Sequence, residues 1–259
     1  MVYGKLLQNI VFTKANYDLM SSYMELINTL DRKHPVFVLD DNVMTSGKPL
    51  DFTSIEDVAA HCVPCVLKIL KDSGVTTNKN GKVTYPVLLG GWSYGGVISV
   101  EISKLLQHHN ASSSEIVDIK SIVLFDSPLR AVASSGKQAA DTAHIASAYQ
   151  RAKLDDVDGP TNAAAVDAET ERRTELHFNA CTDLLLVYYR RPAETNSLQI
   201  PIVDVRPQLT NYHCDLSVVQ ELSSVPVRRV VVPGTHWTML FGEFVGAVGK
   251  LINEDILKD

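Results

Sequence analysis

The feature that most constrains this chain is a cluster of glycines around one serine, Gly90-Gly91-Trp92-Ser93-Tyr94-Gly95-Gly96. The cluster directly follows a short apolar segment, Thr84–Leu89, which is typical of a β-strand. It precedes a second segment, Val97 to about His108, that is typical of a helix. A strand-to-helix turn this tight leaves no room for side chains at the glycine positions that flank the serine. The glycines therefore predict an elbow that holds Ser93 at strained backbone angles and exposes its hydroxyl.

Strand-like and helix-like segments alternate along most of the chain. Strands are expected at Leu6–Phe12, Val36–Leu39, Thr84–Leu89, Ser121–Phe125, Ile200–Val205 and Arg228–Val232. Helices are expected over Tyr17–Leu30, from a capping box at Thr53 to about Lys71, after the elbow, and from about Phe241 to Ile252. Residues 130–195 are rich in Ala, Thr, Asp and Glu, and they predict a mostly helical insertion with a helix from Asp167 to Tyr189.

This alternation predicts the α/β class and, with the elbow, the α/β-hydrolase fold. We expect a single domain over residues 1–259, with a mainly parallel sheet, helices on both of its faces and a helical insertion at 130–195. In such sheets the reactive groups gather where the strands end. The elbow, Asp126 and the Gly234–Trp237 loop each follow a predicted strand, so all three are expected at that edge.

A serine hydroxyl needs a base, and this fold places the groups in the chain order serine, acid, histidine. His236 fits, because its Pro-Gly loop directly follows the last predicted strand. The other histidines precede the serine or lie at a helix end, in the insertion or in a polar loop: His34, His61, His108, His109, His144, His177 and His213. Spacing leaves the acid open between Asp126 and Asp215, whereas Asp204 is expected as a buried polar partner inside a strand.

Charge and composition exclude several other classes of function. A net charge of −6 disfavours binding to nucleic acid or to an anionic membrane surface. No apolar run approaches the roughly 18 residues of a membrane span, and the N-terminus lacks a signal-peptide pattern. Cys62 and Cys65 fall mid-helix, and with Cys181 and Cys214 they are expected to be core or lining thiols in a reducing cytoplasm.

Three segments resemble the thioesterase domains of polyketide synthases and nonribosomal peptide synthetases, together with their free-standing relatives. They are the elbow at Leu88–Gly96, the strand end at Ile122–Ser127 and the histidine loop Pro233-Gly234-Thr235-His236-Trp237-Thr238-Met239-Leu240. The histidine loop is the most specific of the three. A further segment, Leu39-Asp40-Asp41, is most similar to fungal polyketide enzymes.

The resemblance implies that Asp126 is the acid and completes a catalytic triad with Ser93 and His236. It also implies that residues 130–195 form a lid over an acyl pocket, and that Trp92 and Trp237 bind substrate. The oxyanion hole would combine the N–H groups of Tyr94 and Ala15. The family's glycine-containing loop is replaced here by residues 10–16, which contain no glycine.

The activity implied by the resemblance is release of a polyketide or peptide acyl chain in secondary metabolism. The chain would arrive as a thioester on the phosphopantetheine arm of an acyl or peptidyl carrier protein, and would leave through an acyl-serine by hydrolysis or cyclisation. No metal and no cofactor of the enzyme's own is implied.

Two alternatives remain open. One is a general carboxylesterase or lipase-like serine hydrolase that acts on small esters without a carrier protein. The other is a non-catalytic binding module on a hydrolase fold, which is favoured only by the missing glycines around Ala15.

Overall fold

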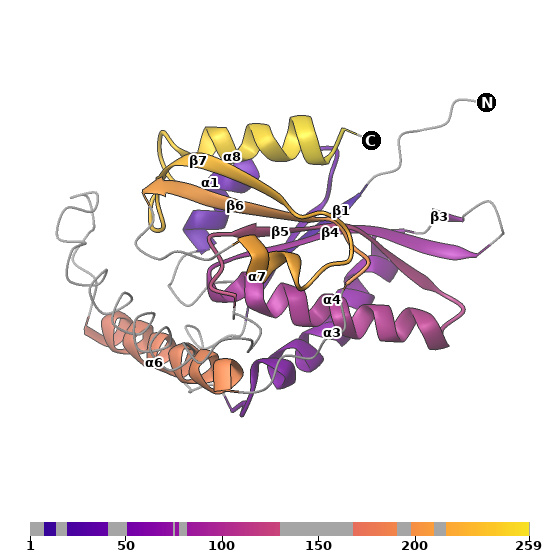
Figure 1. Ribbon diagram of the computed structural model, residues 1–259, viewed down its shortest axis with the longest axis horizontal. Coiled ribbons are helices and arrows are strands. Elements are labelled where there is room, and N and C mark those ends of the chain that lie inside the picture. The colour runs from indigo at the N-terminus through magenta and orange to yellow at the C-terminus, as the bar shows by residue number, and fades with distance from the viewer. Residues whose placement is uncertain are drawn as a thin grey trace.

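A computed structural model of the chain describes residues 8–13, 20–40, 51–74, 76–77, 82–129, 168–190, 198–209 and 216–258. These residues form a seven-stranded sheet (Figure 1). Six strands follow one another across it, in the order β2 (Val36–Leu39), β1 (Asn9–Thr13), β4 (Val83–Trp92), β5 (Ile116–Phe125), β6 (Ile202–Leu209) and β7 (Arg228–Thr235). All neighbours in this series pair in parallel, and the short β3 (Thr76–Thr77) pairs antiparallel with β4. The predicted mainly parallel α/β sheet is confirmed.

Helices cover both faces of the sheet (Figure 1). On one face lie α1 (Met20–Thr29) and α8 (Val245–Leu251), which continues as a short π-helix, η2 (Ile252–Ile256). On the other face lie α3 (Ile55–Asp72), α4 (Tyr94–Ser112), α6 (Ala168–Arg190) and the short α7 (Leu216–Gln220). Helices therefore lie on both faces of the sheet, as the sequence predicts, and each face packs against the helices that cover it.

Each strand supplies two hydrophobic cores, because successive side chains point to opposite faces. Along β5, Ile122 and Leu124 join the core beneath α3 and α4, whereas Val123 and Phe125 join the core beneath α1 and α8. This double burial explains why the central strands are continuous apolar runs instead of alternating patterns.

Several element boundaries differ from the prediction. Strand β5 begins at Ile116, before the predicted Ser121, and α4 begins at Tyr94, directly after Ser93. The N-cap is one residue later than predicted: Ser54 caps α3, and its hydroxyl accepts the N–H of Asp57 at 3.1 Å. Neither β3 nor α7 was predicted, because segments this short carry little periodicity.

The predicted insertion is described only in part. Its expected helix is present as α6, whose Leu184, Leu185 and Tyr188 pack into the core beneath α3 and α4. Residues 130–167 and 191–197 lie outside the described residues, so the role of 130–195 as a lid stays a prediction. Within the described part of the chain, no helix has the length and apolar character needed to cross a bilayer.

Two cysteines on α3 and α6 differ in their surroundings. Cys65 on α3 is exposed, so the expectation of a core or lining position is wrong for this residue. Cys181 on α6 is fully buried, as expected.

The contact between α8 and α1 yields a matched pair of glycine substitutions. A Cβ at Gly249 would lie 2.0 Å from the Thr29 hydroxyl oxygen and 2.5 Å from its Cβ, whereas at Gly246 it meets no described atom within 4 Å. We expect Gly249→Ala to lower the free energy of unfolding by about 1–3 kcal/mol through overpacking. Gly246→Ala should leave it unchanged or raise it by about 0.5 kcal/mol, because alanine favours helices. Urea unfolding measures both, and equal effects of the two substitutions would contradict the packing described.

Candidate active site

Ser93 lies at the predicted elbow, between the end of β4 and the start of α4. Its backbone has φ 54° and ψ −124°, a conformation that side chains disfavour and that is characteristic of strained functional turns. The Ser93 N–H donates to the Phe125 carbonyl of β5 at 2.8 Å, which fixes the elbow to the neighbouring strand. The serine is therefore held in place by its backbone. Ser93 is buried, with 3% of its surface exposed, so the expectation that the elbow exposes its hydroxyl to solvent is not met.

The elbow glycines are required by close backbone approach. A Cβ on Gly91 would lie 2.3 Å from the Gly95 carbonyl carbon, closer than real Cβ contacts allow. A Cβ on Gly96 would lie 1.8 Å from the Ser127 hydroxyl oxygen. Glycine at 91 thus allows the turn to close on itself, and glycine at 96 allows it to pack against the residues after β5, which is the physical basis of the sequence pattern.

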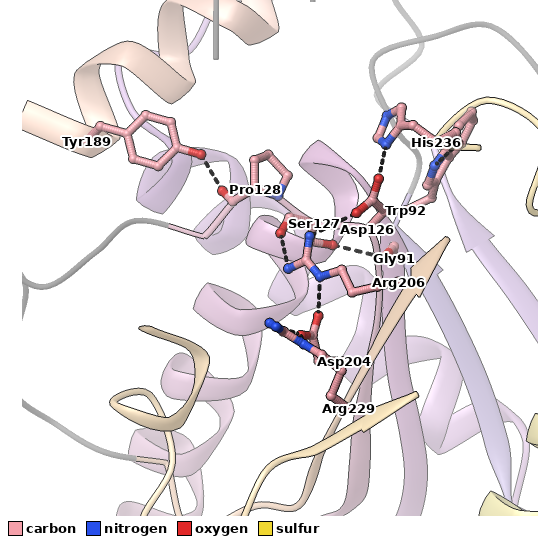
Figure 2. A network of polar contacts seen from close by, with 10 residues as sticks. All are labelled: Gly91, Trp92, Asp126, Ser127, Pro128, Tyr189, Asp204, Arg206, Arg229 and His236. Carbon is pink, nitrogen blue, oxygen red and sulfur yellow. Dashed lines mark hydrogen bonds and ion pairs between the residues drawn. The ribbon is translucent and has the colours of Figure 1, made fainter. Parts of the chain in front are cut away.

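The structure brings Asp126 and His236 together. Asp126 directly follows β5, with φ 44°, and its N–H donates to the Val205 carbonyl of β6 at 2.8 Å. His236 directly follows β7, and its Nδ1 lies 2.8 Å from Asp126 Oδ2 (Figure 2). The pairing of Trp92 with Phe125 places Ser93 and Asp126 side by side at the ends of adjacent strands. Asp215, the other acid considered, lies outside the described residues.

The Asp126 carboxyl is held in its charged form. Burial by itself raises its pKa, but the hydrogen bond and charge of His236, together with Arg206, outweigh burial and bring the pKa below the ordinary value. An ionised carboxylate can only accept hydrogen bonds, so the Nδ1 of His236 must be the donor. Its Nε2 is then the basic nitrogen of the neutral imidazole, as a general base requires.

Trp92 contacts the loop that carries His236. Its indole N–H donates to the His236 carbonyl at 3.0 Å, and its ring centroid lies 5.3 Å from that of His236. Trp92 is buried in the core, whereas Trp237 is half-buried with its ring edge-on to the imidazole at 4.8 Å. The indole N–H of Trp92 is thus used by this loop, and a role for Trp92 or Trp237 in binding substrate stays a prediction.

Tyr23 is a site residue that the sequence did not predict. Its hydroxyl donates to the Thr13 carbonyl at the end of β1 and accepts the Trp92 N–H beside Ser93, both at 2.8 Å. The side chain is buried, and burial raises its pKa well above the usual value, so the hydroxyl stays neutral. One hydroxyl therefore bridges β1 and β4 where their ladder ends. Only the apolar spacing of its helix was readable in the sequence.

Of the two predicted oxyanion donors, Tyr94 lies among the described residues and Ala15 does not. The Tyr94 N–H is the first of α4, at the positive end of the helix dipole. Among the residues that are described, no group of three or more His, Cys, Asp or Glu side chains is arranged to hold a metal ion.

Known proteins resemble this chain in structure. No family model and no curated protein sequence matches it. The Vlm2 thioesterase domain, solved with a bound dodecadepsipeptide, has a TM-score of 0.67 and 20% identity over 98% of this chain and 94% of its own. The thioesterase RedJ, from the prodiginine biosynthetic pathway of Streptomyces coelicolor, has a TM-score of 0.63 and 13% identity over 94% and 89%. The NocB thioesterase domain, in covalent complex with a fluorophosphonate nocardicin G analogue, has 0.62 and 17% over 96% and 94%. At these identities the likeness establishes the α/β-hydrolase fold of thioesterase domains.

The Asp126–His236 contact yields a prediction about the acid. Asp126→Asn replaces an acceptor by an amide that can donate to Nδ1, which favours the wrong imidazole tautomer. We expect kcat with an acyl thioester to fall about 1,000- to 10,000-fold. Asp118→Asn, on the same strand in a half-exposed pair with Lys120, is the control and should leave kcat unchanged. An Asp126→Asn enzyme of normal activity, with activity lost instead in Asp215→Asn, would assign the acid to Asp215.

Proposed function

We propose that this chain is a cytoplasmic thioesterase that uses Ser93, His236 and Asp126 to release an acyl chain from a carrier protein. The substrate class is a polyketide or peptide chain, held as a thioester on a phosphopantetheine arm. The observation that carries the proposal is the 2.8 Å contact of His236 with a buried, ionised Asp126, at the sheet edge where the strained Ser93 elbow lies. The similar folds of several thioesterase domains support the same reaction class.

The first half of the reaction transfers the acyl group to the enzyme. His236 Nε2 takes the hydroxyl proton of Ser93 as Oγ attacks the thioester carbonyl carbon. The negative charge that develops on the carbonyl oxygen is stabilised by the N–H of Tyr94. The C–S bond then breaks, and the thiol of the arm leaves with the proton carried by His236. The product of this half-reaction is an ester between the acyl chain and Ser93.

The second half of the reaction frees the acyl chain from the serine. His236 removes a proton from the incoming nucleophile, which attacks the ester carbonyl, and then returns that proton to Ser93 Oγ as the ester bond breaks. Water as nucleophile gives a carboxylic acid. A hydroxyl, amine or carbon nucleophile within the acyl chain gives a ring. Exclusion of water by the enzyme therefore decides the product.

Two tyrosines of α6 support a lid role for the helix beside this site. The hydroxyl of Tyr188 donates a hydrogen bond to the carboxylate of Glu101 in α4 at 2.6 Å. The Tyr189 hydroxyl donates to the carbonyl of Pro128, two residues after Asp126 (Figure 2). The helix is thus fixed directly to the loop that carries the proposed acid, where it can cover an acyl chain.

A carrier protein is proposed as the partner. One similar structure is a four-domain nonribosomal peptide synthetase, which matches 96% of this chain over 19% of its own length, with a TM-score of 0.58. The occurrence of this fold within a synthetase supports delivery of the substrate on a covalently attached arm.

Trapping of the acyl-enzyme tests the proposed nucleophile. Incubation with an acylated carrier protein should add the mass of the acyl group to the wild-type chain, and a fluorophosphonate should label it at Ser93. Ser93→Ala should show neither adduct. Ser112→Ala, at the exposed end of α4, is the matched control and should behave as wild type. An acyl adduct that persists in Ser93→Ala would overturn the assignment.

Turnover of matched substrates separates a thioesterase from a general esterase. The same acyl group is offered on a carrier protein and as a simple ester, and kcat/KM is compared. A thioesterase should prefer the carrier-bound form by at least about tenfold, whereas equal values would favour the carboxylesterase alternative. Product mass in isotopically labelled water distinguishes hydrolysis from ring closure.

A further inference from the structure

A chain of buried charges extends from the proposed triad into the sheet (Figure 2). Arg206 donates through Nη1 to Asp126 Oδ1 at 2.9 Å and through Nε to Asp204 Oδ1 at 2.8 Å. Arg229 donates to the other Asp204 oxygen through Nε at 2.8 Å and lies 2.7 Å from it through Nη2. From His236 to Arg229, basic and acidic side chains therefore alternate through five residues.

The position of Arg206 follows from the strand register. Val205 of β6 pairs with Phe125, the last residue of β5, so Arg206 within β6 and Asp126 after β5 lie side by side. Val203 and Val205 belong to the core beneath α1 and α8, so Asp204 and Arg206 point to the opposite face. Asp204 and Arg206 therefore form a charged pair on one face of β6, and Arg206 reaches the loop that carries Asp126.

Burial makes this arrangement costly unless its geometry is well satisfied. Arg206 is 4% exposed, and Asp126 and Asp204 are fully buried. Pairs of this kind often add little stability compared with apolar residues of similar size, although removing one partner is strongly destabilising. The presence of Arg206 at the proposed acid is thus poorly explained by stability alone.

The guanidinium fixes both the side chain and the backbone of the Asp126 loop. Its Nη1 donates to Oδ1 of Asp126, so that Oδ2 accepts from His236. Its Nη2 donates to the Ser127 carbonyl at 2.9 Å. These contacts set the plane of the carboxylate and brace a residue whose φ of 44° is strained. The fork of Arg206 is itself held by Asp204 through Nε.

We propose that Arg206 is a positioning residue for the thioesterase reaction, which orients Asp126 toward His236 and stabilises the Asp126 carboxylate by its positive charge. This role rests on the proposed function, because it acts through the triad. The charged groups that face one another here are His236 after β7, Asp126 after β5, Asp204 and Arg206 on β6, and Arg229 on β7.

The sign of the charge effect follows from the order of these groups. The positive charge of Arg206 and its hydrogen bond to Asp126 lower the pKa of the Asp126 carboxyl. Removing that charge raises the pKa of Asp126, so the carboxyl is protonated at higher pH and can no longer accept the Nδ1 hydrogen bond of His236. The pH at which Ser93 becomes reactive should then move upward. A residue with a purely structural role would change the amount of folded enzyme without moving this pH.

Labelling of Ser93 by a fluorophosphonate across pH tests the role without any choice of acyl substrate. In Arg206→Gln we expect the plateau rate to fall about 10- to 50-fold, equivalent to losing one charge-assisted hydrogen bond. The lower midpoint of the pH profile should rise, because the Asp126 carboxyl is then protonated at higher pH. Arg206→Lys keeps the charge but loses the fork, so its rate should fall while its midpoint stays near wild type.

The matched control is Arg228→Gln, which changes a half-exposed neighbour paired with Asp255 at 3.5 Å. It should match wild type in rate and midpoint. Thermal unfolding of each variant ensures that folded protein is compared, and Arg206→Lys serves if Arg206→Gln fails to fold. A folded Arg206→Gln, or an Arg206→Lys, labelled at the wild-type rate and midpoint would overturn the role of Arg206. A wild-type chain that is not labelled at Ser93 at any pH would instead overturn the proposed function, and the role of Arg206 with it.

Discussion

The hydrogen bond between Asp126 and His236 is the interaction on which the site depends. It joins the end of β5 to the loop after β7, two strands away across the sheet, and it lies beside the elbow at the end of β4. The parallel strands bring all three groups to one edge of the sheet although they lie far apart in the sequence. Ser93 and Asp126 both have positive φ, so the edge combines a precise contact with backbone strain.

That strain is held by neutral and by charged supports. On one side, Tyr23 and Trp92 bridge β1, the elbow and the His236 loop through neutral donors and acceptors. On the other side, Arg206, which is itself held by Asp204, brings a buried positive charge to the acid and keeps the carboxylate ionised and oriented. The neutral supports add no net charge to the site, whereas Arg206 does. The same arginine can therefore set both the orientation of the Asp126 carboxylate and its charge, and Asp126 in turn orients the imidazole of His236.

The sequence predicted the parts of the molecule that short patterns encode. The alternation of apolar segments gave the sheet and its helices, and the steric need for Gly91 and Gly96 gave the elbow. Asp204 was expected as a buried polar partner, which the structure confirms, but its partners Arg206 and Arg229 were missed. Their role depends on which strands are neighbours, and local patterns do not contain that order. For the same reason, spacing alone could not choose between Asp126 and Asp215.

The tautomer of His236 shows whether Asp126 leaves the Nε2 of this histidine free of its proton, as a general base requires. In protein with nitrogen-15-labelled histidine, the His236 signals are identified by their loss in His236→Gln, and the chemical shifts of the two ring nitrogens are followed with pH. A working triad requires that the neutral ring carries its proton on Nδ1, bonded to Asp126, with Nε2 unprotonated, and we expect this tautomer. A neutral His236 with its proton on Nε2 would contradict the proposed triad, because that nitrogen could not then remove the proton of Ser93.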